Sequence, residues 1–289
     1  MKIGWFPGHM KKALDMMKNE LKNVDLIIYV LDARAPKTCL NPKFKNICDN
    51  RPIIYVLNKT DMTDENVTKK WAEYLLSVNG KNSDVVLLDS RKSTGANIIK
   101  TKMKQMLATK IENNLRKGIK IPMRAMVIGV PNSGKSTLIN SCVGKSKTVT
   151  GNKAGVTRGK QWVKVDNNID LLDTPGTLYP NIEDEDVANK LAYIGSVRDE
   201  VVDMGELGYS FLEFMLKNFR NNLIERYNIE INEDSTTLSV MEDICYKRGL
   251  VPKNKDVDYE KTGRAIIDDF RKCRLGLITL DLLNGEENG

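Results

Sequence analysis

A glycine-rich segment near the middle of the 289-residue sequence has the composition of a phosphate-binding loop. Gly129-Val-Pro-Asn-Ser-Gly-Lys-Ser136 fits the pattern G-x-x-x-x-G-K-[ST], with an apolar run before it and a helical pattern after it. The glycines let backbone N–H groups curl around a β-phosphate, the lysine neutralises β- and γ-oxygens, and the serine hydroxyl binds Mg²⁺. The residues predicted to contact the nucleotide here are Asn132, Ser133, Gly134, Lys135, Ser136 and Thr137.

Two downstream positions are predicted to complete a site for magnesium and the γ-phosphate. In the segment Asp173-Thr-Pro-Gly176, the aspartate can hold a metal-bound water and the N–H of Gly176 can contact a γ-phosphate. Such a loop can sense hydrolysis, because its partner is gone once the γ-phosphate leaves. Thr157 lies between the two motifs and is predicted to complete the Mg²⁺ shell together with Ser136.

The choice of base is predicted from a second polar segment, which directly follows an apolar run. A carboxylate can accept two hydrogen bonds from guanine N1–H and N2–H₂, whereas adenine offers no matching pair of donors and would leave a buried carboxylate unpaired. Asn58 can tie this segment to the phosphate loop, and a later segment can offer a backbone N–H to guanine O6. The residues assigned to guanine recognition are Asn58, Lys59, Thr60, Asp61, Asp89 and Ser90. The predicted ligands are therefore GTP and GDP.

Alternating strands and helices are predicted to position these loops. Short apolar runs that end in polar loops predict buried strands at Leu26–Leu31, Ile53–Leu57, Val85–Leu88 and Ala125–Ile128. Apolar residues at helical spacing predict amphipathic helices between the strands, with stripes over Met10–Leu21, Val67–Leu75 and Ile99–Met106. This alternation indicates an α/β fold with a mostly parallel sheet that is covered on both faces.

The spacing of apolar residues changes in the second half of the sequence. Val163 and Val165 alternate with polar residues up to Asn167-Asn168, which predicts an antiparallel hairpin over 161–173 at an edge of the sheet. After Pro180 the patterns are helical, as in the four-residue steps from Leu207 to Phe219. We therefore expect a nucleotide-binding α/β domain over residues 1–180 and an all-helical domain over residues 181–289.

Charge is distributed unevenly along the chain. Residues 1–180 contain 31 Lys and Arg against 15 Asp and Glu, a balance of +16, whereas residues 181–289 contain 14 against 23, a balance of −9. A basic body joined to an acidic end suggests a polyanionic partner for the basic part. The alternative is a lysine-rich surface that is simply solvated.

Composition and cysteine spacing exclude several classes of protein. Hydrophobic residues make up 41% and charged residues 29%, which is ordinary for a globular chain and unlike a disordered one. No apolar run is long enough for a membrane span, and the first residues lack a signal or transit pattern, so we expect a cytoplasmic protein without a membrane partner. The five cysteines include no CxxC and His9 is the single histidine, so we expect neither zinc nor a disulfide framework.

The order of the motifs is unusual. The guanine-reading segment (58–61) precedes the phosphate loop (129–136), which precedes Thr157 and Asp173. In ordinary small GTPases the phosphate loop comes first, so this order indicates a circularly permuted GTPase, which the closeness of chain ends in such folds permits. The permutation leads the loop at Gly176 directly into the helical domain.

Together with Trp5-Phe-Pro-Gly-His9-Met10, this motif set resembles the ribosome biogenesis GTPase A family over essentially the whole chain. The resemblance implies a circularly permuted P-loop GTPase domain followed by an all-helical, RNA-binding domain. It implies hydrolysis of GTP to GDP and phosphate, stimulated by the large ribosomal subunit, during late assembly of that subunit. It also implies contact with ribosomal RNA and a dependence on potassium through Asn132.

The resemblance also bears on catalysis. Small GTPases place a glutamine directly after the glycine of this loop to orient the attacking water, and here that position is Thr177. The family implies that His9 compensates as the catalytic residue; the alternative is that His9 caps a helix that begins near Met10. Thr177 also departs from the bulky apolar residue common in the family, so the resemblance does not imply a hydrophobic gate at this position.

The helical domain contains one basic stretch that can face RNA phosphates. Residues 247–274 hold nine basic residues against five acidic ones: Lys247, Arg248, Lys253, Lys255, Lys261, Arg264, Arg271, Lys272 and Arg274. A solvated helix face is the alternative. Two other functions stay open from the sequence: a GTP-gated RNA-binding scaffold with negligible turnover, and a GTPase that acts on membrane or protein cargo.

Overall fold

The protein is described by a computed structural model that covers residues 7–48, 51–80, 82–92, 94–144, 161–178, 182–251 and 256–283. These residues fall into two compact units, an α/β unit within Trp5–Asn181 and a helical unit within Ile182–Gly289. Among the helices in these ranges, none combines the length and the apolar character that crossing a membrane requires.

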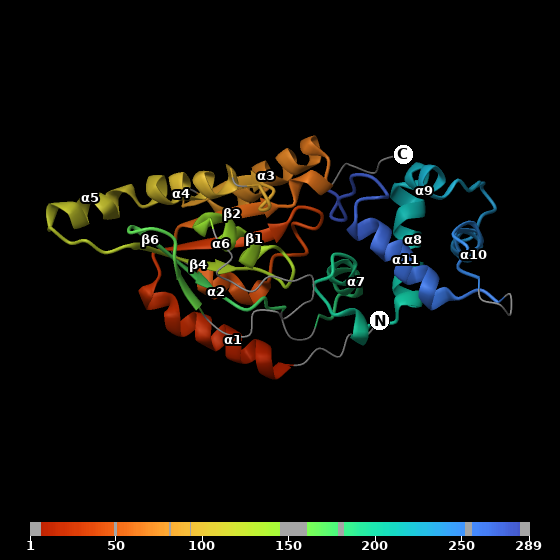
Figure 1. Ribbon diagram of the computed structural model, residues 1–289, viewed down its shortest axis with the longest axis horizontal. Coiled ribbons are helices and arrows are strands. Elements are labelled where there is room, and N and C mark those ends of the chain that lie inside the picture. Colours follow the sequence, from red (N-terminus) through yellow and green to blue (C-terminus); the bar gives the residue numbers. More distant parts are fainter. Residues whose placement is uncertain are drawn as a thin grey trace. The chain divides into compact units, whose positions relative to one another are not determined.

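A mostly parallel sheet forms the centre of the α/β unit (Figure 1). Its strands are β1 (Leu26–Asp32), β2 (Ile53–Asn58), β3 (Ser83–Leu88), β4 (Met123–Ile128), β5 (Gln161–Lys164) and β6 (Ile169–Asp173). They lie in the order β3-β2-β1-β4-β6-β5; β5 pairs with β6 antiparallel and the other pairs are parallel. All residues of β1 and β2 are buried, as expected for central strands covered on both faces. The predicted strands, the parallel sheet and the edge hairpin are confirmed.

Helices lie along both sides of this sheet (Figure 1). They are α1 (Pro7–Glu20), α2 (Lys45–Cys48), α3 (Glu65–Asn79), α4 (Thr94–Met106), α5 (Ala108–Arg116) and α6 (Lys135–Val143), with 3₁₀ turns η1 (Leu21–Asn23), η2 (Pro42–Phe44) and η3 (Thr60–Met62). Ile99 of α4 and Leu138 of α6 share one core with alternate residues of the strands, among them Ile28. Tyr29 points to the opposite face, where its ring meets that of Phe44 edge-on at 5.4 Å between centroids.

The register brings the carboxyl ends of the parallel strands to one edge of the sheet. Asp32, the last residue of β1, pairs with Asn58, the last residue of β2, and Asn58 pairs with Leu88 of β3. On the other side of β1, β4 and β6 run parallel and Val127 pairs with Asp173. The loops that carry the predicted motifs therefore leave the same edge. The strand order reverses between β1 and β4, which is where open α/β sheets bind ligands.

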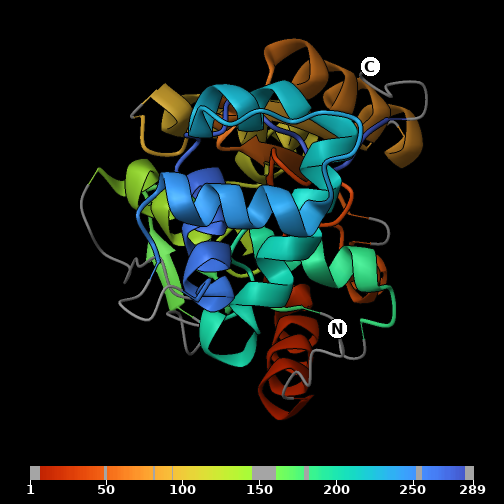
Figure 2. The same cartoon turned by 90° about the vertical axis from the view of Figure 1, so that its right-hand side faces the viewer.

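The second unit is helical throughout the part that the structure describes (Figure 2). Its elements are α7 (Glu185–Tyr193), η4 (Asp199–Val201), α8 (Met204–Asn218), α9 (Arg220–Tyr227), α10 (Thr237–Lys247) and α11 (Tyr259–Arg271). The crossing of α8 and α11 is close, since a Cβ on Gly208 would lie 2.3 Å from Gly263 Cα. Near it, Phe211 packs against Phe270 with ring centroids 4.9 Å apart.

Two expected helix boundaries differ from the structure. α1 begins at Pro7 rather than near Met10, in keeping with the preference of proline for the first turn of a helix. The apolar stripe from Leu207 was expected to include Phe219, but α8 ends at Asn218 and Phe219 leaves the helix with φ −145°. Its ring instead lies against that of Phe214, with centroids 5.8 Å apart.

Candidate functional site

The phosphate-loop sequence forms a tight turn between β4 and α6. Gly129, Asn132 and Gly134 have positive φ angles of 151°, 59° and 99°, and α6 begins at Lys135. A Cβ on Gly134 would lie 2.1 Å from Asn58 Nδ2, so glycine is required here because another side chain approaches the backbone. The turn ends at the amino end of α6, where backbone N–H groups have no partner within the helix and can bind an anion. Thr137 lies in the first turn of α6.

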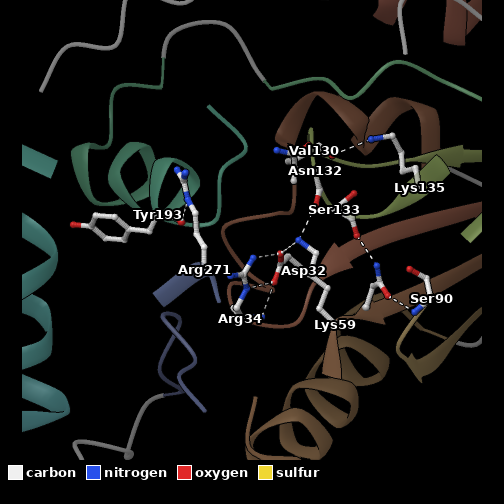
Figure 3. A network of polar contacts seen from close by, with 11 residues as sticks. Asp32, Arg34, Lys59, Ser90, Val130, Asn132, Ser133, Lys135, Tyr193 and Arg271 are labelled. Atoms are coloured by element: carbon white, nitrogen blue, oxygen red, sulfur yellow. Dashed lines mark hydrogen bonds and ion pairs between the residues drawn. The ribbon is translucent and has the colours of Figure 1, made fainter. Parts of the chain in front are cut away.

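Lys135 folds back over its own loop (Figure 3). Its Nζ donates to the carbonyl oxygens of Gly129 and Val130 at 3.2 and 2.9 Å, and the side chain is buried. Burial lowers the pKa of Lys135 to about 8, against the attraction of Asp173. Beside it, Ser133 is also buried, and its hydroxyl has no hydrogen-bond partner among the described residues. The loop therefore concentrates a cation and polar groups at one point.

Asn58 ties three loops together. Its Nδ2 donates to the Ser133 carbonyl at 2.7 Å, and its Oδ1 accepts a hydrogen bond from the Ser90 backbone N–H at 2.9 Å. The predicted link between this asparagine and the phosphate loop is therefore present. One buried amide thus fixes the spacing between the segment that follows β2, the segment that follows β3 and the phosphate loop.

Lys59 joins the phosphate loop to a buried ion pair. Its backbone is left-handed, with φ 63°, and its Nζ donates to Asp32 Oδ2 at 2.7 Å and to the Asn132 carbonyl at 2.8 Å. Asp32 also accepts hydrogen bonds from Arg34, from Nε at 2.9 Å and from Nη2 at 2.8 Å (Figure 3). Burial alone would raise the pKa of Asp32, but the charges and hydrogen bonds of Arg34 and Lys59 hold it well below its usual range.

Sequence reasoning missed Asp32 and Arg34. The signal that could have found them is a charged pair at the end of a wholly apolar strand, since Asp32 directly follows Leu26–Leu31. Ionised side chains at the buried end of a strand need charged partners. Because ligands of open α/β sheets bind at the strand ends, charged residues there are candidates for the site.

The two carboxylates predicted for guanine recognition share one guanidinium. Arg91 donates from Nη2 to Asp61 Oδ2 at 2.5 Å, and from Nε and Nη2 to Asp89 at 2.9 Å each. These hydrogen bonds lower the pKa of Asp89. Arg91 is 68% exposed, so this cluster lies at the surface end of the site, while Thr60 begins the η3 turn beside it. Arg91 was not among the predicted site residues.

Two residues of the predicted magnesium site, Ser136 and Asp173, meet at the end of β6. Ser136 Oγ donates to Asp173 Oδ2 at 3.1 Å, and Asp173 is buried. A hydroxyl and a carboxylate are oxygen donors of the kind that Mg²⁺ prefers, so these two side chains fit such an ion. Thr157 lies outside the described residues. Within those residues, no group of three or more His, Cys, Asp or Glu side chains is placed to hold a metal ion.

The loop after Asp173 packs directly on the phosphate loop. A Cβ on Gly176 would lie 2.6 Å from Pro131 Cα and 2.9 Å from Lys135 Nζ. The next residue, Thr177, is buried; its N–H donates to the Gly129 carbonyl at 3.3 Å, and its carbonyl accepts from Asn41 Nδ2 at 3.3 Å. The Thr177 hydroxyl has no hydrogen-bond partner in the described part of the chain.

His9 falls in the first turn of α1, because that helix starts at Pro7. It therefore does not stand before the helix as a cap. The His9 side chain lies outside what the structure describes.

Comparisons with known proteins agree with this geometry. The model of the family described as 50S ribosome-binding GTPase matches residues 124–239, a range that starts in β4 just before the phosphate loop. The chain is 38% identical to ribosome biogenesis GTPase A of Priestia megaterium over 97% of both chains. It is 29% identical to ribosome biogenesis GTPase A of Thermotoga maritima over 96% of this chain and 94% of the relative.

Two solved structures share the fold. The GDP-bound structure of TM YlqF superposes with a TM-score of 0.65 at 27% identity, over 92% of this chain and 98% of that chain. The GNP-bound structure of YlqF from T. maritima gives 0.64 at 27% identity, over 93% and 97%. Identity at this level across nearly the full length of both chains, on a permuted α/β fold followed by a helical unit, shows that the chain belongs to the ribosome biogenesis GTPase A family.

Proposed function

We propose that this protein binds GTP and GDP at the carboxyl edge of the sheet and hydrolyses GTP to GDP and phosphate during late assembly of the large ribosomal subunit. The observation that carries the proposal is the pair of hydrogen bonds of Asn58, because it links a guanine-reading segment to a phosphate loop. Relatives over the whole chain are named for ribosome biogenesis, which supports the choice of partner.

The base is recognised from the β2 and β3 loops. Asp61 accepts the N1–H and N2–H₂ groups of guanine, and the Asp89-Ser90 segment offers a backbone N–H to O6. Lys59 lies along the plane of the base, while its amine stays on the Asn132 carbonyl. Thr60 keeps Asp61 in place by starting the η3 turn. Adenine is rejected because it offers no pair of N–H donors that matches the two oxygens of the Asp61 carboxylate.

The phosphates are held at the amino end of α6. Backbone N–H groups from Ser133 to Thr137 surround the β-phosphate, and Lys135 exchanges its two carbonyl partners for β- and γ-oxygens. Ser136, with Thr157, would hold Mg²⁺, and Asp173 would hold one of its waters. A bound Mg²⁺ neutralises charge on the phosphates. Asn132 is the proposed ligand of a potassium ion.

Hydrolysis needs a group that orients water, and His9 is the proposed one. The Thr177 hydroxyl is a poor candidate for that role, because Thr177 is buried and its backbone is hydrogen-bonded to Gly129 of the phosphate loop. A neutral imidazole can orient a water by hydrogen bonding near pH 7. The N–H of Gly176 bonds to the γ-phosphate and is released after hydrolysis. The ribosomal subunit stimulates turnover, and the helical unit contacts ribosomal RNA in the cytoplasm.

A GTP-gated RNA-binding scaffold is the second candidate. The observation that favours it is that Thr177, at the usual position of the water-orienting glutamine, is turned into the protein. A scaffold of this kind binds RNA in the GTP state and turns over negligibly.

Multiple-turnover release of phosphate, with and without purified large ribosomal subunits, separates the two candidates. We expect subunits to raise turnover of the wild type at least about tenfold, equivalent to about 1.4 kcal/mol in activation free energy. Lys135→Ala should lose GTP binding, whereas His9→Ala should keep GTP affinity and lose most of the stimulated rate. Turnover that stays negligible with subunits would favour the scaffold, and normal turnover by His9→Ala would remove His9 from catalysis.

A further inference from the structure

We infer that three arginines of the helical unit, Arg226, Arg248 and Arg274, form a binding site for the phosphate groups of RNA. The inference rests on the proposed function, because that function supplies RNA as the partner. It adds the residues that bind the RNA. The inferred site includes Arg248 and Arg274 from the basic stretch over 247–274, together with Arg226 from another helix.

The three guanidinium groups converge on one buried carboxylate. Arg226 places Nε and Nη2 each 3.0 Å from Asp269 Oδ2, and Arg274 donates from Nη1 to Asp269 Oδ1 at 2.9 Å. Arg248 Nη1 lies 3.6 Å from Oδ2 of the same residue. Arg226 lies in α9, Arg248 directly follows α10, and Arg274 lies in the loop that follows α11. Asp269 itself is fully buried.

One carboxylate cannot neutralise three guanidinium groups. Asp269 offers a single negative charge, so the cluster keeps an excess of two positive charges. The side chains of Arg226, Arg248 and Arg274 are 27%, 34% and 43% exposed, so this excess reaches the solvent. Each guanidinium has five N–H donors, and the hydrogen bonds to Asp269 use only a part of them. Donors in a rigid planar fork match the oxygens of a phosphate.

A pocket beside Arg226 and Arg274 can accept a phosphate group. It has a volume of about 310 Å³ and is lined by Asn222, Glu225, Arg226, Arg274, Leu275 and Gly276. Its wall is fixed, because Asn222 Nδ2 donates to the Leu275 carbonyl at 2.8 Å. Gly276 has φ 90°, and a Cβ there would lie 2.6 Å from Asn222 Nδ2, so the close approach requires glycine.

Acidic neighbours reduce the excess but do not cancel it. Glu225 lines the pocket, and Asp268 Oδ2 lies 3.5 Å from Arg274 Nη1 and accepts a hydrogen bond from Lys272. With these groups included, four basic side chains face three acidic ones, which leaves one positive charge. Residues 181–289 as a whole carry −9, so this point is locally positive in an acidic unit.

Other bases of the same stretch have different roles or positions. Arg271 donates to the carbonyls of Ala192 and Tyr193 and to Asp199, so it holds α11 to the end of α7 (Figure 3). Arg264 pairs with Glu260 one turn earlier on α11. Lys253 and Lys255 lie outside the described residues.

The test compares the full-length wild type with Arg248→Gln/Arg274→Gln. Arg226 is left in place, because two of its nitrogens contact the buried Asp269 and its loss would leave that charge poorly paired. Arg264→Gln is the matched control, since it removes one arginine from the same unit away from the cluster. Arg248→Lys/Arg274→Lys keeps the charge and removes the fork. The probe is ribosomal RNA extracted from large ribosomal subunits, with its affinity measured against salt concentration.

We expect the glutamine variant to bind RNA more weakly. Its slope of log K against log salt should fall by about one for each phosphate that is no longer neutralised. The lysine variant should keep most of the slope but bind less tightly, and Arg264→Gln should match the wild type. Unchanged slope and affinity in a glutamine variant with wild-type thermal unfolding would overturn the site. So would equal losses of affinity in Arg264→Gln, because they would indicate unspecific charge.

Two controls separate failure of the site from failure of the proposed function. GTP affinity and phosphate release with large subunits are measured on the same proteins. If the wild type is stimulated by subunits while the glutamine variant binds RNA normally, the arginine site is wrong and the proposed function stands. If the wild type binds neither RNA nor subunits, both are wrong.

Discussion

At the scale of the residue, Asp32 is the group on which the nucleotide loops depend. Its carboxylate lies between Arg34 and Lys59 and keeps the Lys59 amine on the Asn132 carbonyl of the phosphate loop. Without that charge, the buried Arg34 would face the partly buried Lys59. Burial lowers the pKa of Lys59, and the charge of Arg34 lowers it further. A buried pair that loses one partner leaves an uncompensated charge, which destabilises by about 3–5 kcal/mol.

We therefore predict that Asp32→Asn weakens GTP and GDP binding by about ten- to a hundredfold, which corresponds to about 1.4–2.7 kcal/mol. The reason is that Lys59 loses its anchor and the loops lose their alignment. Binding of a fluorescent GDP analogue measures the effect at a temperature where circular dichroism shows a folded variant. Asp84→Asn is the control, because Asp84 forms a partly exposed pair with Lys102 away from the site. A folded Asp32→Asn protein with wild-type affinity would contradict the role.

The second prediction at this scale concerns pH and Lys135. Burial lowers the pKa of its amine from the ordinary 10.5 to about 8, and bound phosphate favours the charged form. The free protein therefore loses this proton as the pH rises through 8, whereas the complex keeps it. Nucleotide affinity should fall with rising pH above about 8, approaching tenfold per pH unit.

Titration of GDP binding between about pH 7 and about pH 9 measures this dependence. Lys135→Arg is the control, since a guanidinium does not titrate in that range, and its affinity should change less with pH. A wild-type affinity that stays constant over the range would show that Lys135 carries its proton throughout.

Site residues differed in how far the sequence alone could predict them. The phosphate loop and the segment 58–61 are contiguous, so their chemistry is visible in a few residues. Asp32 and Arg91 act through partners that lie 27 and 30 residues away along the chain, at Lys59 and Asp61. Such contacts depend on strand order and register, which no local pattern contains. The same limit applies to Thr177, whose burial follows from the packing of its loop on Gly129.

At the scale of the element, strands were predictable and helix ends were not. A run of buried residues in β1 is visible as an unbroken apolar segment. The end of α8 is set by backbone geometry at Phe219, where the chain turns although the apolar spacing continues. The crossing of α8 and α11 was also invisible, because it depends on Gly208 and Gly263, which lie far apart in sequence and meet through their backbones.

This crossing leads to a prediction about Gly263→Ala. A Cβ at Gly263 would lie 1.9 Å from the Met204 carbonyl oxygen, so α8 and α11 must separate to admit it. We expect the helical unit to lose about 1–3 kcal/mol, as is usual for overpacked cores. Urea unfolding followed by circular dichroism measures the loss. In the control Gly205→Ala, the nearest atom to the new Cβ is a side-chain oxygen of Asp203 at 3.2 Å, and the loss should be smaller. Equal stability of Gly263→Ala and the wild type would mean that the helices do not pack this closely.

At the scale of the whole molecule, the permuted order of the motifs means that the loop at Gly176 is joined to the helical unit directly along the chain. Gly176 belongs to the loop proposed to sense the γ-phosphate, and α7 of the helical unit begins at Glu185. Only a short connection separates the two along the chain. In an unpermuted order, the same loop would lead back into the nucleotide-binding domain. We therefore expect a change at Gly176 to act on the helical unit through tension in this short connection.

The last prediction tests this requirement with an insertion. Six residues of Gly and Ser placed between Asn181 and Ile182 should leave GTP affinity unchanged, because the insertion point lies outside the predicted nucleotide-binding residues. The insertion should reduce stimulation by large subunits. A flexible insert separates the movement of its two ends, so coupling of about 1.4 kcal/mol, or tenfold in rate, should be lost. The measurement is phosphate release with and without subunits. The same insert after Gly118, where a Cβ would meet no neighbour and the chain has positive φ, is the matched control and should keep full stimulation. If both insertion variants keep full stimulation by large subunits, the α/β unit itself communicates its nucleotide state to the ribosome. The connection from Gly176 to the helical unit then has no role in this coupling.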